Sequence, residues 1–227
     1  MRHGVWLLLG GLCGLVGCFA PFTWPEERDL PVAHISVAAL PDESMLKAAE
    51  ALERGDEATA ITHMREYVKA NPDAVMPRAH FAEMLFRAGH ADEARRQYER
   101  FVADAQPSTG APRRQLVPCH TRLVALAEGA GDTYAEALNR GIGLLLIAER
   151  DPDDGANERT LALALAALRE AQAERPDTSR ANFYVSEVYR SLGQTGAANR
   201  ALAVARANLP DPTLTPTEHE KLLAPAQ

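Results

Sequence analysis

Three stretches of the chain repeat one order of residue types at one spacing. In each, a glycine is followed five places later by an alanine, and apolar residues come four and seven places after that alanine. These offsets fall on one face of an α-helix, so each stretch predicts a helix that begins just after a glycine turn. The stretches are Gly55, Ala60, Met64, Tyr67 and Pro72; Gly89, Ala94, Tyr98 and Phe101; and Gly193, Ala198, Leu202, Ala205 and Pro210. Such a repeat cannot bury its apolar face alone, so it predicts a stack of helix pairs.

The composition favours the same kind of fold. Of the 227 residues, 46% are hydrophobic but only 6% are aromatic, and alanine and leucine dominate from Ser44 to Leu209. This bias favours helices over a β-rich fold. The net charge is -7, with acidic and basic residues interspersed, which is unlike the basic face that binds phosphate backbones. We therefore expect an all-α protein that has no nucleic-acid partner.

The first 22 residues are of a different kind. The stretch from Gly4 to Phe22 has no charged residue, which is typical of a signal peptide or a membrane-spanning helix. Within it, Leu15-Val16-Gly17-Cys18 resembles the lipobox of bacterial lipoproteins, in which a peptidase cuts before a lipid-modified cysteine. The resemblance implies a signal peptide over residues 1–17 and a lipid on Cys18. The alternative is an uncleaved transmembrane helix, and either would tether the protein to a membrane.

The lipobox resemblance also implies a place in the cell. It predicts a lipid-anchored protein of the bacterial cell envelope that faces the periplasm. Phe19 stands where an aspartate commonly retains lipoproteins at the inner membrane, which favours the outer membrane. Residues 18–41 are rich in proline and predict an extended spacer. With Cys13 removed and Cys18 lipidated, Cys119 has no disulfide partner, and we expect it to be a small core residue.

The repeated helix pairs resemble the tetratricopeptide repeat. In that family a small residue of the second helix packs against the first helix, as Ala60 and Ala94 would here, and a proline such as Pro72 ends the unit. The resemblance implies a right-handed α-solenoid over residues 42–212 with about four repeats, at about 41–74, 75–108, 133–178 and 179–212. Residues 213–227 would form a capping helix and a tail. The middle is irregular: a helix from Pro112 to Glu128 has no evident partner, and whether residues 112–150 are a degenerate repeat stays open.

No group of residues predicts catalysis or a metal centre. Cys119 and His120 are adjacent, so on a helix their side chains diverge by about 100°, which does not suit a nucleophile and its base. The aspartates Asp151, Asp153 and Asp154 lack the spacing of a calcium-binding loop. We expect no catalytic residue, no metal site and no cofactor.

The remaining candidate for function is a surface. In tetratricopeptide arrays the first helix of each pair lines a concave groove, and the resemblance implies a peptide-binding groove here. Its expected residues are Met45, Ala49, Leu52, Ala79, Glu83, Phe86, Arg87, Arg180, Phe183, Glu187 and Arg190. An aromatic ring beside an arginine is typical of peptide anchors, which makes Phe86 and Phe183 the main candidates. The alternative is that both phenylalanines are core residues.

Two classes of function follow from these patterns. The first is a non-enzymatic, membrane-tethered scaffold that binds a protein or peptide in the cell envelope, in outer-membrane assembly or secretion. The second is a regulatory subunit, or a small-ligand or enzymatic protein with a site in the irregular region of residues 112–158.

Overall fold

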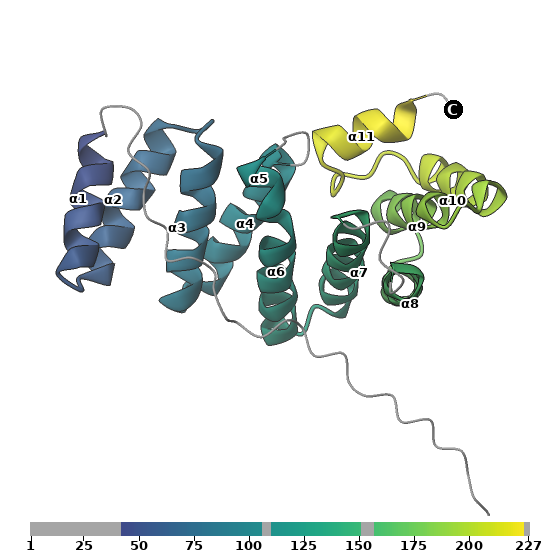
Figure 1. The fold of residues 1–227 in the computed structure, drawn as a ribbon, viewed down its shortest axis with the longest axis horizontal. Coiled ribbons are helices and arrows are strands. Elements are labelled where there is room, and N and C mark those ends of the chain that lie inside the picture. Colours follow the sequence, from purple (N-terminus) through teal and green to yellow (C-terminus); the bar gives the residue numbers. More distant parts are fainter. Residues whose placement is uncertain (1–41, 106–109, 151–156, 225–227) are drawn as a thin grey trace, which may run out of the picture. The chain divides into compact units, whose positions relative to one another are not determined.

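The structure, a computed structural model, describes residues 42–105, 110–150 and 157–224 (Figure 1). Every element of regular secondary structure in this part of the chain is an α-helix, which confirms the prediction of an all-α fold. The predicted signal peptide, the lipobox with Cys18 and the spacer lie outside the described residues. None of the described helices is long and apolar enough to cross a membrane.

The helices follow one another with short connections. Their bounds are α1 Glu43–Glu53, α2 Glu57–Ala70, α3 Val75–Arg87, α4 Ala91–Ala105, α5 Ala111–Arg114, α6 Leu116–Ala130, α7 Thr133–Arg150, α8 Asn157–Glu174, α9 Ser179–Ser191, α10 Thr195–Ala207 and α11 Pro216–Leu223. Aspartate side chains cap the N-termini of α1 and α2. The Asp42 carboxylate accepts a hydrogen bond from the Ser44 backbone N–H at 2.8 Å, and the Asp56 carboxylate accepts one from the Thr59 backbone N–H at 3.0 Å. These bonds satisfy amide groups that have no partner within the helix.

One turn geometry joins α1 to α2, α3 to α4, α6 to α7 and α9 to α10. The turns contain Gly55, Gly89, Gly131 and Gly193, each in the left-handed region with φ between 68° and 78°. In every case the glycine N–H donates to the carbonyl three residues earlier, and the next N–H donates to the carbonyl five residues before it. A residue with a Cβ is strained in this conformation, which explains the glycine. The sequence pattern predicted three of these turns but not the one at Gly131.

Each helix packs mainly on its neighbours in the sequence. The pairs α1–α2, α3–α4, α6–α7 and α9–α10 are in contact, and so are α2–α3, α4–α6 and α8–α9. Helix α6, for which no partner was evident, packs on α7, and α7 also packs extensively on α8. Stacking of consecutive helices in this way makes an α-solenoid. The middle of the stack is irregular because α7 packs on both α6 and α8.

The core lies between the stacked pairs. The alanines expected to pack between helices are fully buried: Ala60 and Ala94 are 0% exposed and Ala198 is 2% exposed. Helices α7 and α8 come especially close at Gly141, where an added Cβ would lie 2.5 Å from the Leu168 Cγ atom. Small residues therefore set the distance between helices at several levels of the stack.

Candidate functional site

Helices α3 and α6 share a polar cluster centred on Glu83. Arg122 of α6 donates from Nε to Oε2 and from Nη2 to Oε1 of this carboxylate, both at 3.0 Å. The hydroxyl of Tyr98 donates to Oε2 at 2.6 Å, and Nε of Arg87 donates to Oε1 at 2.9 Å. Burial raises the pKa of Glu83, but the hydrogen bonds from Arg122, Tyr98 and Arg87 outweigh it and lower the pKa below its usual value. The carboxylate is therefore charged and holds two arginines in place.

Phe86 lies beside this cluster. The Arg122 guanidinium carbon stands 4.6 Å from the centroid of the Phe86 ring, a cation–π distance. The ring is half-buried because part of it packs against the core, while the Arg87 side chain is 53% exposed. Two helix pairs thus present a partly exposed aromatic ring with fixed positive charges beside it.

The other residues of the expected groove have different surroundings. Met45 and Ala49 of α1 are half-buried and Leu52 is 42% exposed, while Glu187 and Arg190 of α9 form an ion pair on the surface. Ala79 and Phe183, which the groove prediction placed on the exposed face, are buried, so for Phe183 the alternative of a core position is correct. Ala79 is 7% exposed in the core of the first pairs, and Phe183 is 3% exposed with its ring edge against Tyr184. Their first-helix positions turn inward because the neighbouring pair covers them. A role in peptide binding stays a prediction for the exposed members.

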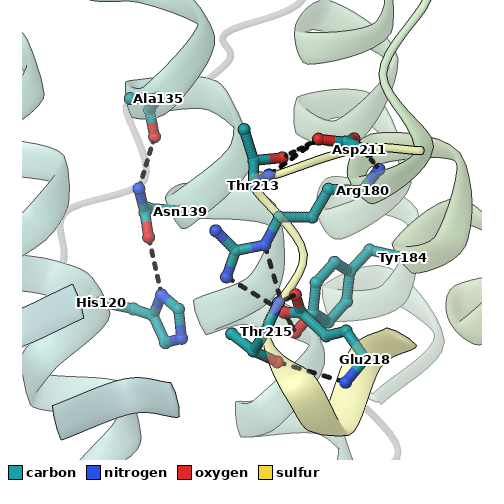
Figure 2. A network of polar contacts seen from close by, with 9 residues as sticks. All are labelled: His120, Ala135, Asn139, Arg180, Tyr184, Asp211, Thr213, Thr215 and Glu218. Atoms are coloured by element: carbon teal, nitrogen blue, oxygen red, sulfur yellow. Dashed lines mark hydrogen bonds and ion pairs between the residues drawn. The ribbon is translucent and has the colours of Figure 1, made fainter. Parts of the chain in front are cut away.

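Arg180, also expected in the groove, belongs instead to a network with α11 (Figure 2). Its Nε and Nη2 atoms donate to Oε1 of Glu218 at 3.1 and 3.0 Å, and the Tyr184 hydroxyl donates to the same oxygen at 2.5 Å. The Thr215 backbone N–H donates to Oε2 of Glu218 at 2.7 Å. Thr215 and Glu218 also form a capping box at the start of α11, and the sequence did not reveal the partners of Glu218 in α9.

A cavity of about 70 Å³ lies next to this network, between α6, α7, α9 and α11. Its floor is almost fully buried and largely apolar, with Leu116, Ile142, Leu145 and Phe183 between 1% and 3% exposed, and the buried side chains of Tyr184 and Glu218 also line it. Charged residues from α5, α7, α9 and α11 stand around it: Arg113, Glu149, Glu187 and Lys221. This cavity was not predicted from the sequence, because its walls come from elements far apart in the chain.

His120 of α6 lines the cavity and is only 1% exposed. Its Nδ1 atom lies 2.9 Å from Oδ1 of Asn139, and the Asn139 amide donates from Nδ2 to the Ala135 carbonyl at 2.8 Å (Figure 2). Burial lowers the pKa of His120 to about 4, although the bond to Asn139 opposes this shift. The imidazole is therefore neutral near pH 7. No cluster of three or more histidine, cysteine or acidic side chains suited to a metal ion occurs among the described residues.

Comparison with protein families bears on the first helix pair. Residues 43–74 match the tetratricopeptide repeat. This segment contains α1, the Gly55 turn and α2, and the resemblance of the pair to a tetratricopeptide repeat is confirmed there. A search of curated proteins found no match to the chain.

The chain is also similar to several solved structures. The crystal structure of MamA protein shares 16% identity, over 81% of this chain and 96% of that one, with a TM-score of 0.39. The assembly chaperone of RpL4 (Acl4) shares 18%, over 81% and 82%, with a TM-score of 0.40. MamA 41-end from Desulfovibrio magneticus RS-1 shares 11%, over 75% and 97%, with a TM-score of 0.32. No function is inferred from these similarities. The tetratricopeptide-like fold is assigned from the turns and helix contacts described above.

Proposed function

We propose that this protein is a non-enzymatic tetratricopeptide scaffold, tethered to a membrane of the bacterial cell envelope, that binds a partner protein or peptide on the first-helix face of α3 and α6. One observation carries the proposal: the Glu83 carboxylate holds Arg87 and Arg122, which come from two neighbouring helix pairs, and the Arg122 guanidinium lies over the Phe86 ring. Aromatic and arginine side chains contribute most of the binding energy in many protein interfaces.

The fixed geometry of this surface supports a binding role. An arginine loses rotational freedom when a partner immobilises it, and that loss weakens binding. Here Glu83 already holds Arg122 through two hydrogen bonds, so little further ordering is needed. The part of Phe86 that stays exposed offers an apolar contact beside the charges. The surface suits a peptide that carries both an apolar and an acidic side chain.

The proposed membrane tether is inferred from the N-terminal sequence. It rests on Leu15-Val16-Gly17-Cys18 and on the uncharged stretch around them, which resemble a lipoprotein signal. Cys18→Ala should abolish incorporation of labelled fatty acid and move the protein from the membrane to the soluble fraction. Equal labelling of the wild type and the variant would rule out lipidation at this residue. An unlabelled but membrane-bound wild type would favour an uncleaved helix.

Cross-linking in intact cells followed by purification tests the binding surface. We expect the wild type to recover a partner that the double variant Phe86→Ala with Arg87→Ala loses. The matched control is Arg200→Ala with Val204→Ala, which removes an arginine and an exposed apolar side chain from α10. Recovery of the same partners by the α3 variant, with helicity unchanged by circular dichroism, would contradict the assignment of the surface.

A second candidate function is favoured by one observation. The cavity beside His120 takes much of its wall from residues 113–149, inside the region in which the sequence allowed a small-ligand site. A small-ligand protein would bind a free molecule there in the absence of any partner. The chemistry of the cavity decides which ligands it accepts.

A further inference from the structure

The cavity beside His120 has an opening to solvent and a closed floor. Arg113 and Glu149 at its rim have side chains that are 49% and 37% exposed, and Lys221 is exposed as well. The floor residues Leu116 and Ile142 are each 1% exposed. A ligand would therefore enter between α5, α7 and α11 and reach apolar walls. An apolar floor within a polar rim is typical of the pockets that take anchor side chains.

Within the described part of the chain, the imidazole of His120 is hydrogen-bonded through one of its two nitrogens. The Asn139 amide donates to the Ala135 carbonyl, so its oxygen faces His120 and accepts the proton on Nδ1. The neutral ring then carries a lone pair on Nε2. Among the described residues, no hydrogen bond reaches this Nε2 atom. Figure 2 shows the second ring nitrogen on the side of the ring away from Asn139. His120 lines the cavity, so this acceptor favours a ligand that brings an N–H or O–H group.

The charges around the cavity are of both signs, because Arg113 and Lys221 face the acidic residues Glu149, Glu187 and Glu218, and Arg113 pairs with Glu149 at 3.3 Å. An ammonium group would meet both attraction and repulsion there and would lose its hydration. A carboxylate would also meet charges of both signs and has no proton to give to His120. A hydrocarbon would leave Nε2 unsatisfied. A neutral group with a donor for the floor and an acceptor for Lys221 fits all of these residues.

The volume limits the size of the ligand. A single water needs about 10 to 15 Å³ of such space, so 70 Å³ holds roughly five or six non-hydrogen atoms. The side chains of asparagine and glutamine have four and five. Each ends in a carboxamide, which donates two N–H bonds and accepts at its oxygen.

We propose that this cavity is a subsite for the carboxamide side chain of a glutamine or asparagine in the partner protein. The amide N–H donates to Nε2 of His120, the methylene groups pack on Leu145 and Phe183, and the carbonyl accepts from Lys221, because Arg113 is already paired with Glu149 at 3.3 Å. This inference rests on the proposed scaffold function, because it names the chemistry of one contact that the partner makes in addition to those on the α3 and α6 surface.

Small probes test the subsite on the purified full chain. Propionamide matches the glutamine side chain, 2-butanone replaces its NH₂ by CH₃, and propionate replaces it by an oxygen. We expect propionamide to bind with a dissociation constant of about 1 mM and to shift the ¹⁵N signal of His120 Nε2. The ketone should bind roughly fivefold more weakly, because it lacks the donor. Equal binding of ketone and amide, or no binding of the amide, would overturn the proposal.

Two variants locate the binding. His120→Asn keeps a donor for Asn139 but lacks Nε2, so it should lose the preference for amide over ketone. If this variant does not fold, Lys221→Met serves instead, because it keeps the length of an exposed side chain and removes its charge. It should weaken propionamide binding about fivefold. The matched control Lys69→Met changes an exposed lysine of α2 and should bind as the wild type does. Equal binding by Lys221→Met would overturn the orientation proposed for the carbonyl.

Peptides distinguish a partner side chain from a free small molecule. Acetyl-Gly-Gln-Gly-N-methylamide should shift the His120 signal, and acetyl-Gly-Glu-Gly-N-methylamide, which has no primary carboxamide, should not. Binding of free propionamide or glutamine without binding of the peptide would overturn the partner assignment and favour a small-ligand protein. These measurements need no partner, so their failure is distinct from failure of the scaffold function. That function fails only if capture in cells is independent of Phe86 and Arg87.

Discussion

Glu218 of α11 accepts two hydrogen bonds from the guanidinium group of Arg180 in α9, at 3.1 and 3.0 Å. The side chains are 1% and 17% exposed, so both charges are largely out of water. Burial lowers the pKa of Arg180, but the attraction of Glu218 raises it by more, and the arginine stays charged. A buried pair of this kind is costly to break, because the remaining charge has neither a partner nor water. The C-terminal helix is therefore fixed to α9 by chemistry as well as by the packing of Leu222, which is 0% exposed.

Glu218→Ala should lower the free energy of unfolding by about 3 kcal/mol, because it leaves Arg180 buried and unpaired. Urea unfolding followed by circular dichroism measures the change. Glu220→Ala is the matched control, since Glu220 lies on the same helix but is exposed, and it should change stability by less than about 0.5 kcal/mol. Similar losses in the two variants would show that the pair contributes nothing beyond helix packing.

Acid should weaken the fold through His120. The pKa of this histidine is lowered from 6.5 to about 4 by burial, with Asn139 and Glu218 opposing the shift and Arg180 assisting it. Between these values the unfolded chain binds a proton that the folded chain does not, so the free energy of unfolding falls as the pH drops below about 6.5. The contribution is complete above pH 6.5 and its loss reaches about 3 kcal/mol near pH 4.

Urea unfolding at pH 7.5, 6.0 and 5.0 measures this dependence. Burial also lowers the pKa of His80, so His80 and His120 both reduce the free energy of unfolding of the wild type as the pH falls. His120→Asn isolates the contribution of His120: the variant should be less stable at pH 7.5, but its stability should fall less steeply below pH 6.5. Parallel curves for the variant and the wild type would show that His120 does not titrate as its burial implies.

The fold was largely predictable because packing between helices requires small residues at fixed intervals. Gly55, Gly89 and Gly193 are each followed five places later by an alanine, and the structure buries all three alanines. The turn at Gly131 escaped this pattern because the fifth residue after it is Glu136. The buried small residue, Ala137, comes one place later. The helix register is shifted there, and a search at constant spacing does not find it.

The candidate site was predictable only in part. Glu83, Phe86 and Arg87 lie on one helix, so their common surface follows from helical periodicity. Their partner Arg122 comes from α6, whose place in the stack the sequence did not give. The cavity beside His120 was still less predictable, because its walls come from α5, α6, α7, α9 and α11. Burial of Phe183 has the same origin, since contacts between pairs decide which first-helix positions stay exposed.

Two glycines within helices should respond to alanine in opposite ways. Gly141→Ala would place a Cβ 2.5 Å from Leu168 Cγ and 3.2 Å from the Ala164 carbonyl oxygen, so α7 and α8 must separate. We expect a loss of about 1 to 3 kcal/mol. Gly129→Ala in α6 meets nothing within 4 Å and should stabilise the protein by about 0.5 to 1 kcal/mol through helix propensity. Thermal unfolding of the two variants checks the contrast, and a loss at Gly129 would contradict the packing seen around α6.

Cys119 should be chemically inert in the folded protein. It is 3% exposed, and burial raises the pKa of its thiol, so little reactive thiolate is present. Replacing Cys13 and Cys18 by serine leaves Cys119 as the one thiol of the chain. In that variant, reaction with a chromogenic disulfide reagent should be at least about a hundredfold slower in buffer than in urea, because the thiol must wait for local opening.

A matched variant separates burial from intrinsic reactivity. Ser191→Cys, made with all three native cysteines replaced, places a thiol at an exposed position at the end of α9 and should react rapidly in buffer. The absorbance of the released thiolate follows both reactions. If Cys119 reacted as fast as the cysteine at position 191, α6 would have to open readily from α4 and α7. Such opening would also expose His120, which follows Cys119 on the same helix, and would leave the carboxamide cavity without a stable floor.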